Sequence, residues 1–150
     1  MKPADGQMRV ASIAGLLMMM VGVGGLISTH AILSSSPPVV VAQVAAAALM
    51  LWARLTFGRR SLHAAADPTE GGLVMTGPYR FIRHPIYTAI CLFCWAAVLA
   101  HLSVMSVVFG GLVTVGAFIR MISEERLLVE RYPGYRQYAL VTKRMVPHVF

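Results

Sequence analysis

The feature that most constrains this chain is an uncharged run from Ile86 to Ile119, which contains no Asp, Glu, Lys or Arg. As one α-helix this run would be about 50 Å long, whereas the hydrocarbon core of a bilayer is roughly 30 Å thick. We therefore expect the run to fold back on itself near residues 100–103 and to form two shortish helices. A second uncharged run, Val10 to Ser28, has about the length of one membrane span.

The composition also indicates that the bilayer is the solvent of this chain. Of its 150 residues, 57% are hydrophobic and 13% are charged, whereas soluble domains have about 45–50% and about 25%. A chain of this length has room for one domain, and a soluble domain of that size could not bury so much apolar surface. We therefore expect a single all-α integral membrane domain that covers residues 1–150.

The positions of the basic residues predict the topology. Of the 13 Lys and Arg residues, two precede the first span, five lie between Arg54 and Arg83, and six lie from Arg120 onward. The loops expected at residues 29–38 and 100–103 contain none. Because Lys and Arg are enriched on the cytoplasmic side of membranes, this pattern predicts about four transmembrane helices with both termini in the cytoplasm.

The second span and the C-terminal segment complete this organisation. The second span is expected at Val39–Phe57, after a loop that contains serines and a diproline. After the fourth span the sequence turns amphipathic and breaks at Pro133-Gly134, which predicts a short cytoplasmic C-terminal helix. Small residues at Ala45–Ala48 and at Gly110-Gly111 suit close helix packing and are compatible with a homodimer.

The net charge of +7 does not indicate a nucleic-acid-binding protein. The basic residues separate the apolar runs and do not gather on one soluble face. Anionic lipid headgroups are therefore the partners that we expect for them. Cys91 and Cys94 lie inside an apolar run without a second pair of ligands, so we expect them to pack in the core, with no metal site.

Two polar clusters flank the long uncharged run. The first is the stretch GGLVMTGPYRFIRHPIY at residues 71–87, and the second is Arg120-x-x-x-Glu124-Glu125. The pair His84-Pro85 favours an extended residue followed by the first turn of a helix. His84 and Tyr87 should therefore lie near a helix N-terminus, which attracts anionic groups. Because the charge pattern places both clusters on the cytoplasmic side, we predict that they form one site.

Glu124 and Glu125 follow the fourth span without a break in the sequence. Adjacent residues of a helix point about 100° apart, so we expect only one of them to face inward together with Arg120. The alternative is a solvated Arg–Glu pair on the helix surface, worth a few tenths of a kcal/mol. The spacing alone leaves both interpretations open.

Together these elements resemble a known family. The stretch GPYRFIRHPIY before a helical hairpin, followed by R-x-x-x-E-E, YxxY and a late VP, is similar to the isoprenylcysteine carboxyl methyltransferases and to the related phospholipid N-methyltransferases. The similarity covers about residues 69–147. It implies a multi-pass cell-membrane enzyme whose site faces the cytoplasm and uses S-adenosyl-L-methionine. It also divides the domain into two N-terminal spans with a connector, residues 1–68, and a methyltransferase-like core, residues 69–150.

The resemblance implies roles for residues of both clusters. The stretch that begins at Gly71, the turn into the third span and one glutamate of the last helix would bind the cofactor. The implied cofactor-binding residues are Gly72, Leu73, Val74, Tyr79, His84, Pro85, Ile86, Tyr87 and Glu124. The candidate catalytic residues are Arg83, Arg120 and Glu125. The sequence departs from the carboxyl methyltransferases at Gly71, where those enzymes usually have a histidine.

The resemblance implies a methyl acceptor that is a lipophilic small molecule or a lipid, and it leaves the reactive group of that acceptor open. Arg120 could orient a carboxylate bidentately, which favours O-methylation of an isoprenylcysteine-like or other lipid-soluble acid. The alternative is a phospholipid amine, which must lose a proton, with Glu124 or Glu125 as the base. Two further alternatives are an NADPH-dependent membrane reductase of the sterol C14-reductase type and a membrane protein that is not an enzyme.

Overall fold

The computed structural model describes residues 3–58 and 72–147, and for residues 3–5 it describes the backbone only. Within these ranges the regular elements are helices, which confirms the all-α prediction. They are α1 (Pro3–Ser28), α2 (Pro37–Phe57), the short 3₁₀ helix η2 (Gly77–Arg80), α3 (Pro85–Ala100), α4 (Val104–Arg131) and α5 (Tyr135–Val141).

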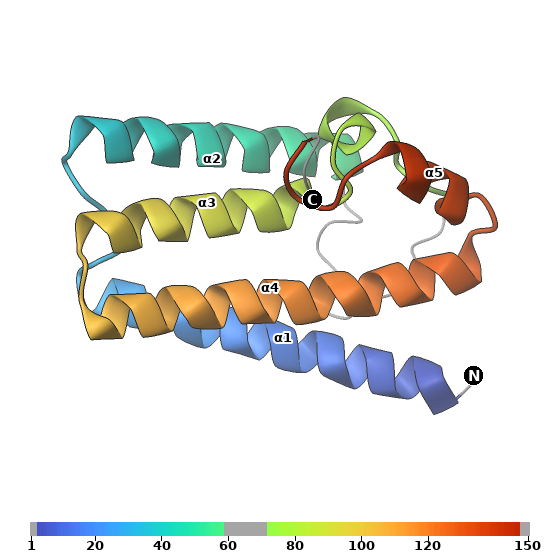
Figure 1. Ribbon diagram of the computed structural model, residues 1–150, viewed down its shortest axis with the longest axis horizontal. Helices are drawn as coiled ribbons and strands as arrows, with labels where there is room; N and C mark the ends of the chain where they lie inside the picture. The colour runs from blue at the N-terminus through green and yellow to red at the C-terminus, as the bar shows by residue number, and fades with distance from the viewer. Residues whose placement is uncertain (1–2, 59–71, 148–150) are drawn as a thin grey trace.

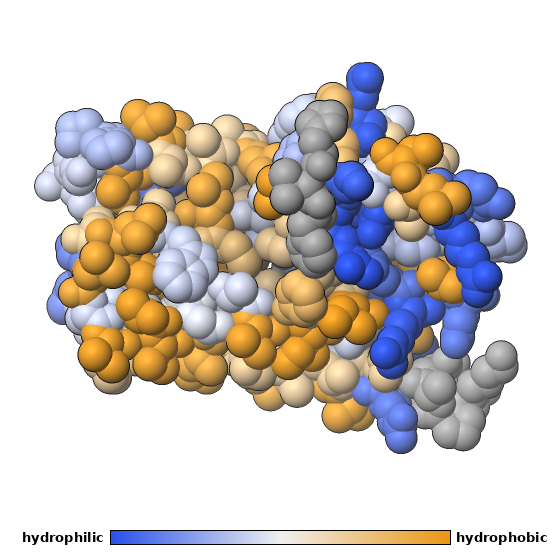
Figure 2. Space-filling view, in the orientation of Figure 1, coloured by the Kyte–Doolittle hydropathy of each residue, from blue (hydrophilic) through white to orange (hydrophobic). Residues whose placement is uncertain are grey.

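The four long helices form an antiparallel bundle (Figure 1). Helix α1 packs against α4, α2 packs against α3, and α3 also contacts α4. The start of α1, the end of α2, the start of α3 and the end of α4 lie at the same end of the bundle, together with η2 and α5. In Figure 2 most of the strongly hydrophilic residues gather at this end, while apolar residues predominate over the rest of the visible face. This arrangement brings the two polar clusters together.

Three of the described helices, α1, α2 and α4, are long and apolar enough to cross a membrane. Helix α3 is apolar but has 16 residues, which corresponds to about 24 Å and is shorter than the hydrocarbon core. The protein is therefore an integral membrane protein by the length and composition of its helices. A fourth span and cytoplasmic termini remain predictions of the charge pattern.

The long uncharged run reverses direction where the sequence predicted. Residues 101–103 connect α3 to α4, and Ser103 caps the new helix. Its hydroxyl accepts a hydrogen bond from the backbone nitrogen of Ser106 at 3.1 Å, and its backbone nitrogen donates to the Ser106 hydroxyl at 2.9 Å. The expectation of two short helices is wrong for the second one, because α4 continues beyond the apolar run to Arg131. The predicted break at Pro133-Gly134 separates α4 from α5.

Glycines bring α1 and α4 into close contact. A Cβ atom at Gly15 would lie 2.7 Å from the carbonyl oxygen of Gly116, and one at Gly22 would lie 2.6 Å from that of Phe109. No side chain fits at these points, so the glycines set how closely the two helices approach. This interface was not predicted from the sequence, because close packing was expected at Ala45–Ala48 and Gly110-Gly111 instead.

Those other small residues have different surroundings. Gly110 is buried inside the bundle, where a Cβ atom would lie 2.9 Å from Cγ2 of Val98. Ala46 is buried as well, whereas Ala45, Ala47 and Ala48 are exposed on α2. Gly110 thus contributes to packing within one chain. A homodimer remains a prediction.

The glycine contacts predict the effect of adding one methyl group. We expect Gly22→Ala to lower the free energy of unfolding in detergent by about 1–3 kcal/mol, because its Cβ would overlap the backbone of α4. Gly24→Ala is the matched control on the same helix, since a Cβ there meets no atom within 4 Å. Unfolding curves that show equal stability for the two variants would contradict the glycine-mediated packing.

The topology predicts which residues a membrane-impermeant thiol reagent can reach. Ser35 lies in the α1–α2 loop and Gln137 lies on α5, and both are exposed. After replacement of Cys91 and Cys94 by alanine, we expect Ser35→Cys to be labelled in intact cells and Gln137→Cys only in permeabilised cells. Labelling of both from the same side would contradict the four-span topology.

Candidate active site

The first polar cluster lies where the chain enters α3. Pro85 is the first residue of the helix, as the His-Pro pair predicted. His84 lies outside the helical region but is not fully extended, because its φ is −126° and its ψ is 55°. No side chain caps this helix end, so the amide groups of its first turn point out of the helix without an intrahelical acceptor. The imidazole of His84 is buried and stacks on the ring of Tyr87, with a centroid distance of 5.7 Å.

A C-terminal segment, residues 142–147, runs beside this entrance. The backbone nitrogen of Arg83 donates to the carbonyl oxygen of Lys143 at 2.7 Å, and that of His84 donates to Arg144 at 2.9 Å. These bonds form a short parallel pairing, which fixes the backbone on which the Arg83 and His84 side chains stand. The sequence analysis assigned no role in the site to this basic tail.

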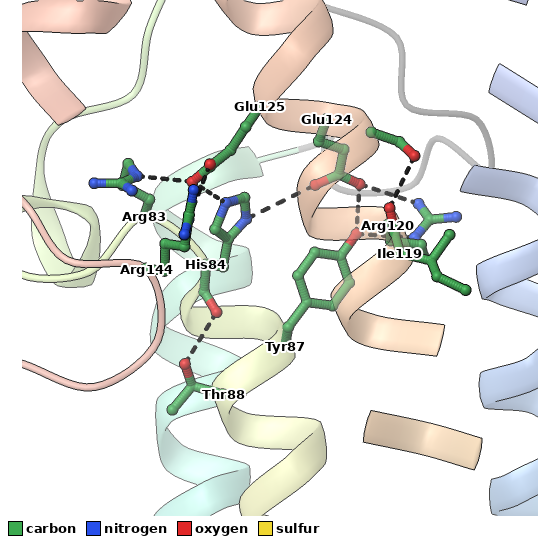
Figure 3. A network of polar contacts seen from close by, with 10 residues as sticks. Arg83, His84, Tyr87, Thr88, Ile119, Arg120, Glu124, Glu125 and Arg144 are labelled. Carbon is green, nitrogen blue, oxygen red and sulfur yellow. Dashed lines mark hydrogen bonds and ion pairs between the residues drawn. The ribbon is translucent and has the colours of Figure 1, made fainter. Parts of the chain in front are cut away.

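Glu125 is the point at which three segments of the chain meet (Figure 3). Its Oε1 lies 2.9 Å from Nε of Arg83 and 3.2 Å from Nε2 of His84, and its Oε2 lies 3.0 Å from Nε of Arg144. The Glu125 side chain is only 13% exposed. Arg83 is held further by the carbonyl oxygens of Ala139 and Thr142. The Glu125 carboxylate therefore links α4 to the start of α3 and to the C-terminal segment.

Glu124, the residue before Glu125 on α4, is the centre of a second group of polar contacts. Its Oε1 accepts hydrogen bonds from the hydroxyl of Tyr87 and from Nη2 of Arg120, the latter at 3.3 Å. Nε of Arg120 also donates to the Tyr87 hydroxyl at 2.8 Å. Among the described residues Oε2 of Glu124 accepts no hydrogen bond, and its side chain is 24% exposed. One carboxylate oxygen thus remains available to a ligand.

The expectation that only one of the two glutamates faces inward is wrong. Glu124 faces Tyr87 in the first turn of α3, whereas Glu125 faces the residues just before α3. The directions of adjacent helical residues do differ, as expected. Both point inward because the entrance to α3 and the C-terminal segment together surround this part of α4.

Arg120 is buried, with 6% of its surface exposed, so the alternative of a solvated surface pair is also wrong. Each of its three guanidinium nitrogens has a protein partner. Nε donates to Tyr87, Nη2 to Glu124, and Nη1 to the backbone carbonyl of Ser12 in α1 at 3.2 Å. Arg120 therefore ties α1 to the two polar clusters.

The remaining predicted residues lie around this network. Tyr79 is buried against Phe57, with ring centroids 5.4 Å apart. Burial, followed by the nearby Tyr138 and Glu124, raises the pKa of Tyr79 above its ordinary value, so the hydroxyl stays protonated. Ile86 lies in the first turn of α3, while Gly72, Leu73 and Val74 lie in the irregular segment before η2. The predicted role of Gly71 lies outside the described residues.

Two contributors to the network were not found from the sequence. Arg144 looked like a lipid-headgroup contact in a basic tail, and only the fold shows that it pairs with Glu125. The carbonyl of Ser12 lies 108 positions from Arg120 along the chain, and backbone atoms leave no sequence signal of such a contact. Among the described residues no group of three His, Cys, Asp or Glu side chains could hold a metal ion.

The comparison with known families decides between the classes left open by the motifs. The sequence model of the phospholipid methyltransferase family matches residues 56–134, slightly more than half of the chain. The chain belongs to this family. The match contains α3, both glutamates and the polar residues before α3, and it excludes α1 and α5. No curated protein and no solved structure matches the chain.

Membership confirms the resemblance inferred from the motifs. The family consists of membrane methyltransferases, which favours methyl transfer over the reductase and over a protein without enzymatic activity. The match does not specify the methyl acceptor. The choice between a lipid-soluble acid and a phospholipid amine must therefore come from the site.

The contacts of Arg120 predict a loss of stability when it is shortened. Arg120→Lys should lower the free energy of unfolding by about 1–3 kcal/mol, because one ammonium cannot reach all three partners and leaves a buried polar group unpaired. Arg136→Lys is the control on exposed α5 and should change it by less than about 0.5 kcal/mol. Chemical unfolding without ligand measures both. Unchanged stability of Arg120→Lys would indicate a side chain free for substrate.

Proposed function

We propose that the protein is an S-adenosyl-L-methionine-dependent methyltransferase that acts on the amine headgroup of a membrane lipid. The observation that carries this proposal is that Arg120 is already engaged within the protein. A carboxylate acceptor needs two adjacent guanidinium N–H groups and an uncompensated charge, but each nitrogen of the buried Arg120 already donates to Tyr87, Glu124 or Ser12, and its charge is paired with Glu124. The O-methylation favoured by the sequence therefore loses its main support.

The polar groups that remain available suit an amine. Oε2 of Glu124 accepts no hydrogen bond from the described residues, and Nδ1 of His84 lies 3.9 Å from it. His84 precedes the start of α3 and Glu124 lies near the end of α4. Both elements are at the end of the bundle (Figure 1) where Figure 2 shows most of the strongly hydrophilic residues, and where the headgroups of a bilayer would be. An ammonium headgroup carries several N–H donors and a positive charge, which the free oxygen of Glu124 can satisfy.

The residues present also fit the cofactor. The uncapped first turn of α3 offers the backbone amides of Ile86 and Tyr87, which suit the carboxylate of the cofactor's methionine part. The segment Gly72–Val74 and Tyr79 would bind the rest, as the family resemblance implies. When bound, the cofactor supplies an electrophilic methyl group.

The role of Glu124 in this proposal differs from the one that the resemblance implied. Glu124 is hydrogen-bonded to Arg120, the residue that the resemblance turns toward the acceptor. In this proposal the carboxylate of Glu124 lies between the cofactor, bound at the first turn of α3, and the acceptor. We therefore assign Glu124 to the acceptor amine, which it would bind and orient for attack.

The acceptor class can be tested with the purified protein in lipid nanodiscs. The assay uses cofactor with a labelled methyl group and offers an ethanolamine phospholipid or a farnesylated cysteine acid. We expect label in the ethanolamine lipid that is stable to alkali, because an N-methyl bond is not hydrolysed. Label that appears only with the acid, and that alkali releases as methanol, would refute the amine proposal.

A further inference from the structure

We propose that His84, supported by Glu125, accepts the proton that an ammonium headgroup must lose before its nitrogen can be methylated. This inference rests on the amine acceptor proposed above. From the sequence, Glu124 or Glu125 was the expected base that removes the proton of the amine. The geometry around the imidazole points to the histidine between them.

The contacts of Glu125 determine which imidazole nitrogen carries hydrogen. Glu125 is paired with both Arg83 and Arg144, as expected of an ionised carboxylate, and an ionised carboxylate only accepts hydrogen bonds. Its Oε1 lies 3.2 Å from Nε2 of His84, so Nε2 must be the donor. In a neutral ring the other nitrogen, Nδ1, is then an acceptor.

Nδ1 of His84, itself an acceptor in this tautomer, faces another acceptor, the carboxylate of Glu124. The nearest oxygen of Glu124, Oε2, lies 3.9 Å away, which is beyond hydrogen-bond distance. Neither atom receives a hydrogen bond from the described residues. A ligand N–H group, or a proton, is what would satisfy both atoms. An ammonium bound by Glu124 would bring its protons within reach of Nδ1.

The two glutamates are less suitable as the final proton acceptor. Both oxygens of Glu125 already accept hydrogen bonds from Arg83, His84 and Arg144. A carboxylate is ordinarily a weaker base than imidazole, and imidazole as a class exchanges protons near neutral pH. The negative charge of Glu125 next to Nε2 would stabilise the imidazolium that forms, as the aspartate does in a catalytic triad.

Charged groups surround the imidazole of His84 from α4, from the residues around the start of α3 and from the C-terminal segment. Glu124 and Glu125 face it from α4, Arg83 and Tyr87 lie beside it at the start of α3, and Arg144 approaches from the C-terminal segment. Glu125 contacts Nε2 directly, whereas Glu124 lies 3.9 Å from Nδ1. The arginines are paired with Glu125 on its other sides.

One N–H bond of the ammonium breaks, and the proton moves to Nδ1 of His84, which leaves a neutral amine with a lone pair. The nitrogen then forms a bond to the methyl carbon while the carbon–sulfur bond breaks and its electron pair stays on sulfur. The methylated nitrogen gains the positive charge that the sulfur loses, and His84 later releases its proton to water.

The test compares two amine lipids that differ in protonation. One has an ethanolamine headgroup, and the other has a fluorinated headgroup whose nitrogen is mostly unprotonated at the assay pH. We expect His84→Gln to lower kcat about 100-fold or more on the first lipid and much less on the second, which has no proton to lose. His101→Gln, in the exposed α3–α4 loop, is the control and should leave both rates unchanged.

Equal losses on the two lipids would show that His84 only positions other groups and would overturn the inference, as would a normal rate on both. Should His84→Gln fail to fold, His84→Asn takes its place, and the same dependence on the lipid is expected. A wild-type protein that methylates only the acid would refute the amine proposal and this inference with it. If the wild-type protein methylates both amine lipids and His84→Gln lowers kcat equally on both, the amine proposal stands and only the proton-accepting role of His84 is refuted.

The tautomer provides a readout that does not depend on activity. In ¹⁵N NMR spectra of the protein in micelles, His84 should carry hydrogen on Nε2 and none on Nδ1, because Glu125 accepts from Nε2. Comparison with the spectrum of His84→Gln assigns the signal. A ring protonated on Nδ1 in the ligand-free protein would overturn the inference, since that nitrogen could not take a proton.

Discussion

The site depends on the ion pairs of Glu125, because three separate segments of the chain converge on this one carboxylate. Arg83 comes from the entrance to α3, Arg144 from the C-terminal segment, and Glu125 from α4. Charges withdrawn from water are costly unless they are paired, and removal of one partner typically costs about 3–5 kcal/mol. The pairing therefore holds the backbone at His84 in one position. The position of the His84 imidazole between Glu124 and Glu125 is fixed in the same way.

A second constraint comes from the glycine contacts between α1 and α4. They allow the backbone of α1 to approach α4 closely enough for the Ser12 carbonyl to meet Arg120. This contact supplies the partner of one guanidinium nitrogen, Nη1, and so helps to hold the Arg120 side chain in place. Helix α1 lies outside the residues matched by the family, so a part of this chain beyond the matched residues contributes to the polar network.

The local features of the fold were predictable because they follow from short-range rules. The uncharged run was too long for one span and reversed at residues 101–103. His84-Pro85 started α3, and Pro133-Gly134 separated α4 from α5. Proline restricts its neighbours in every context, and the bilayer fixes the length of apolar helices. The positions of the charged residues also predicted that the two polar clusters lie at one end of the bundle, because charged groups avoid hydrocarbon.

The chain by itself thus determined the helices, the end of the bundle that carries the charges and most members of the site. Only the tertiary structure decided how they pair. Glu124 and Glu125 both face inward because α3 and the C-terminal segment pack around α4 on adjacent sides. The partners of Arg120 and Glu125 include groups up to 108 positions away. Propensity and spacing act over a few residues, whereas such contacts are set by how whole helices pack.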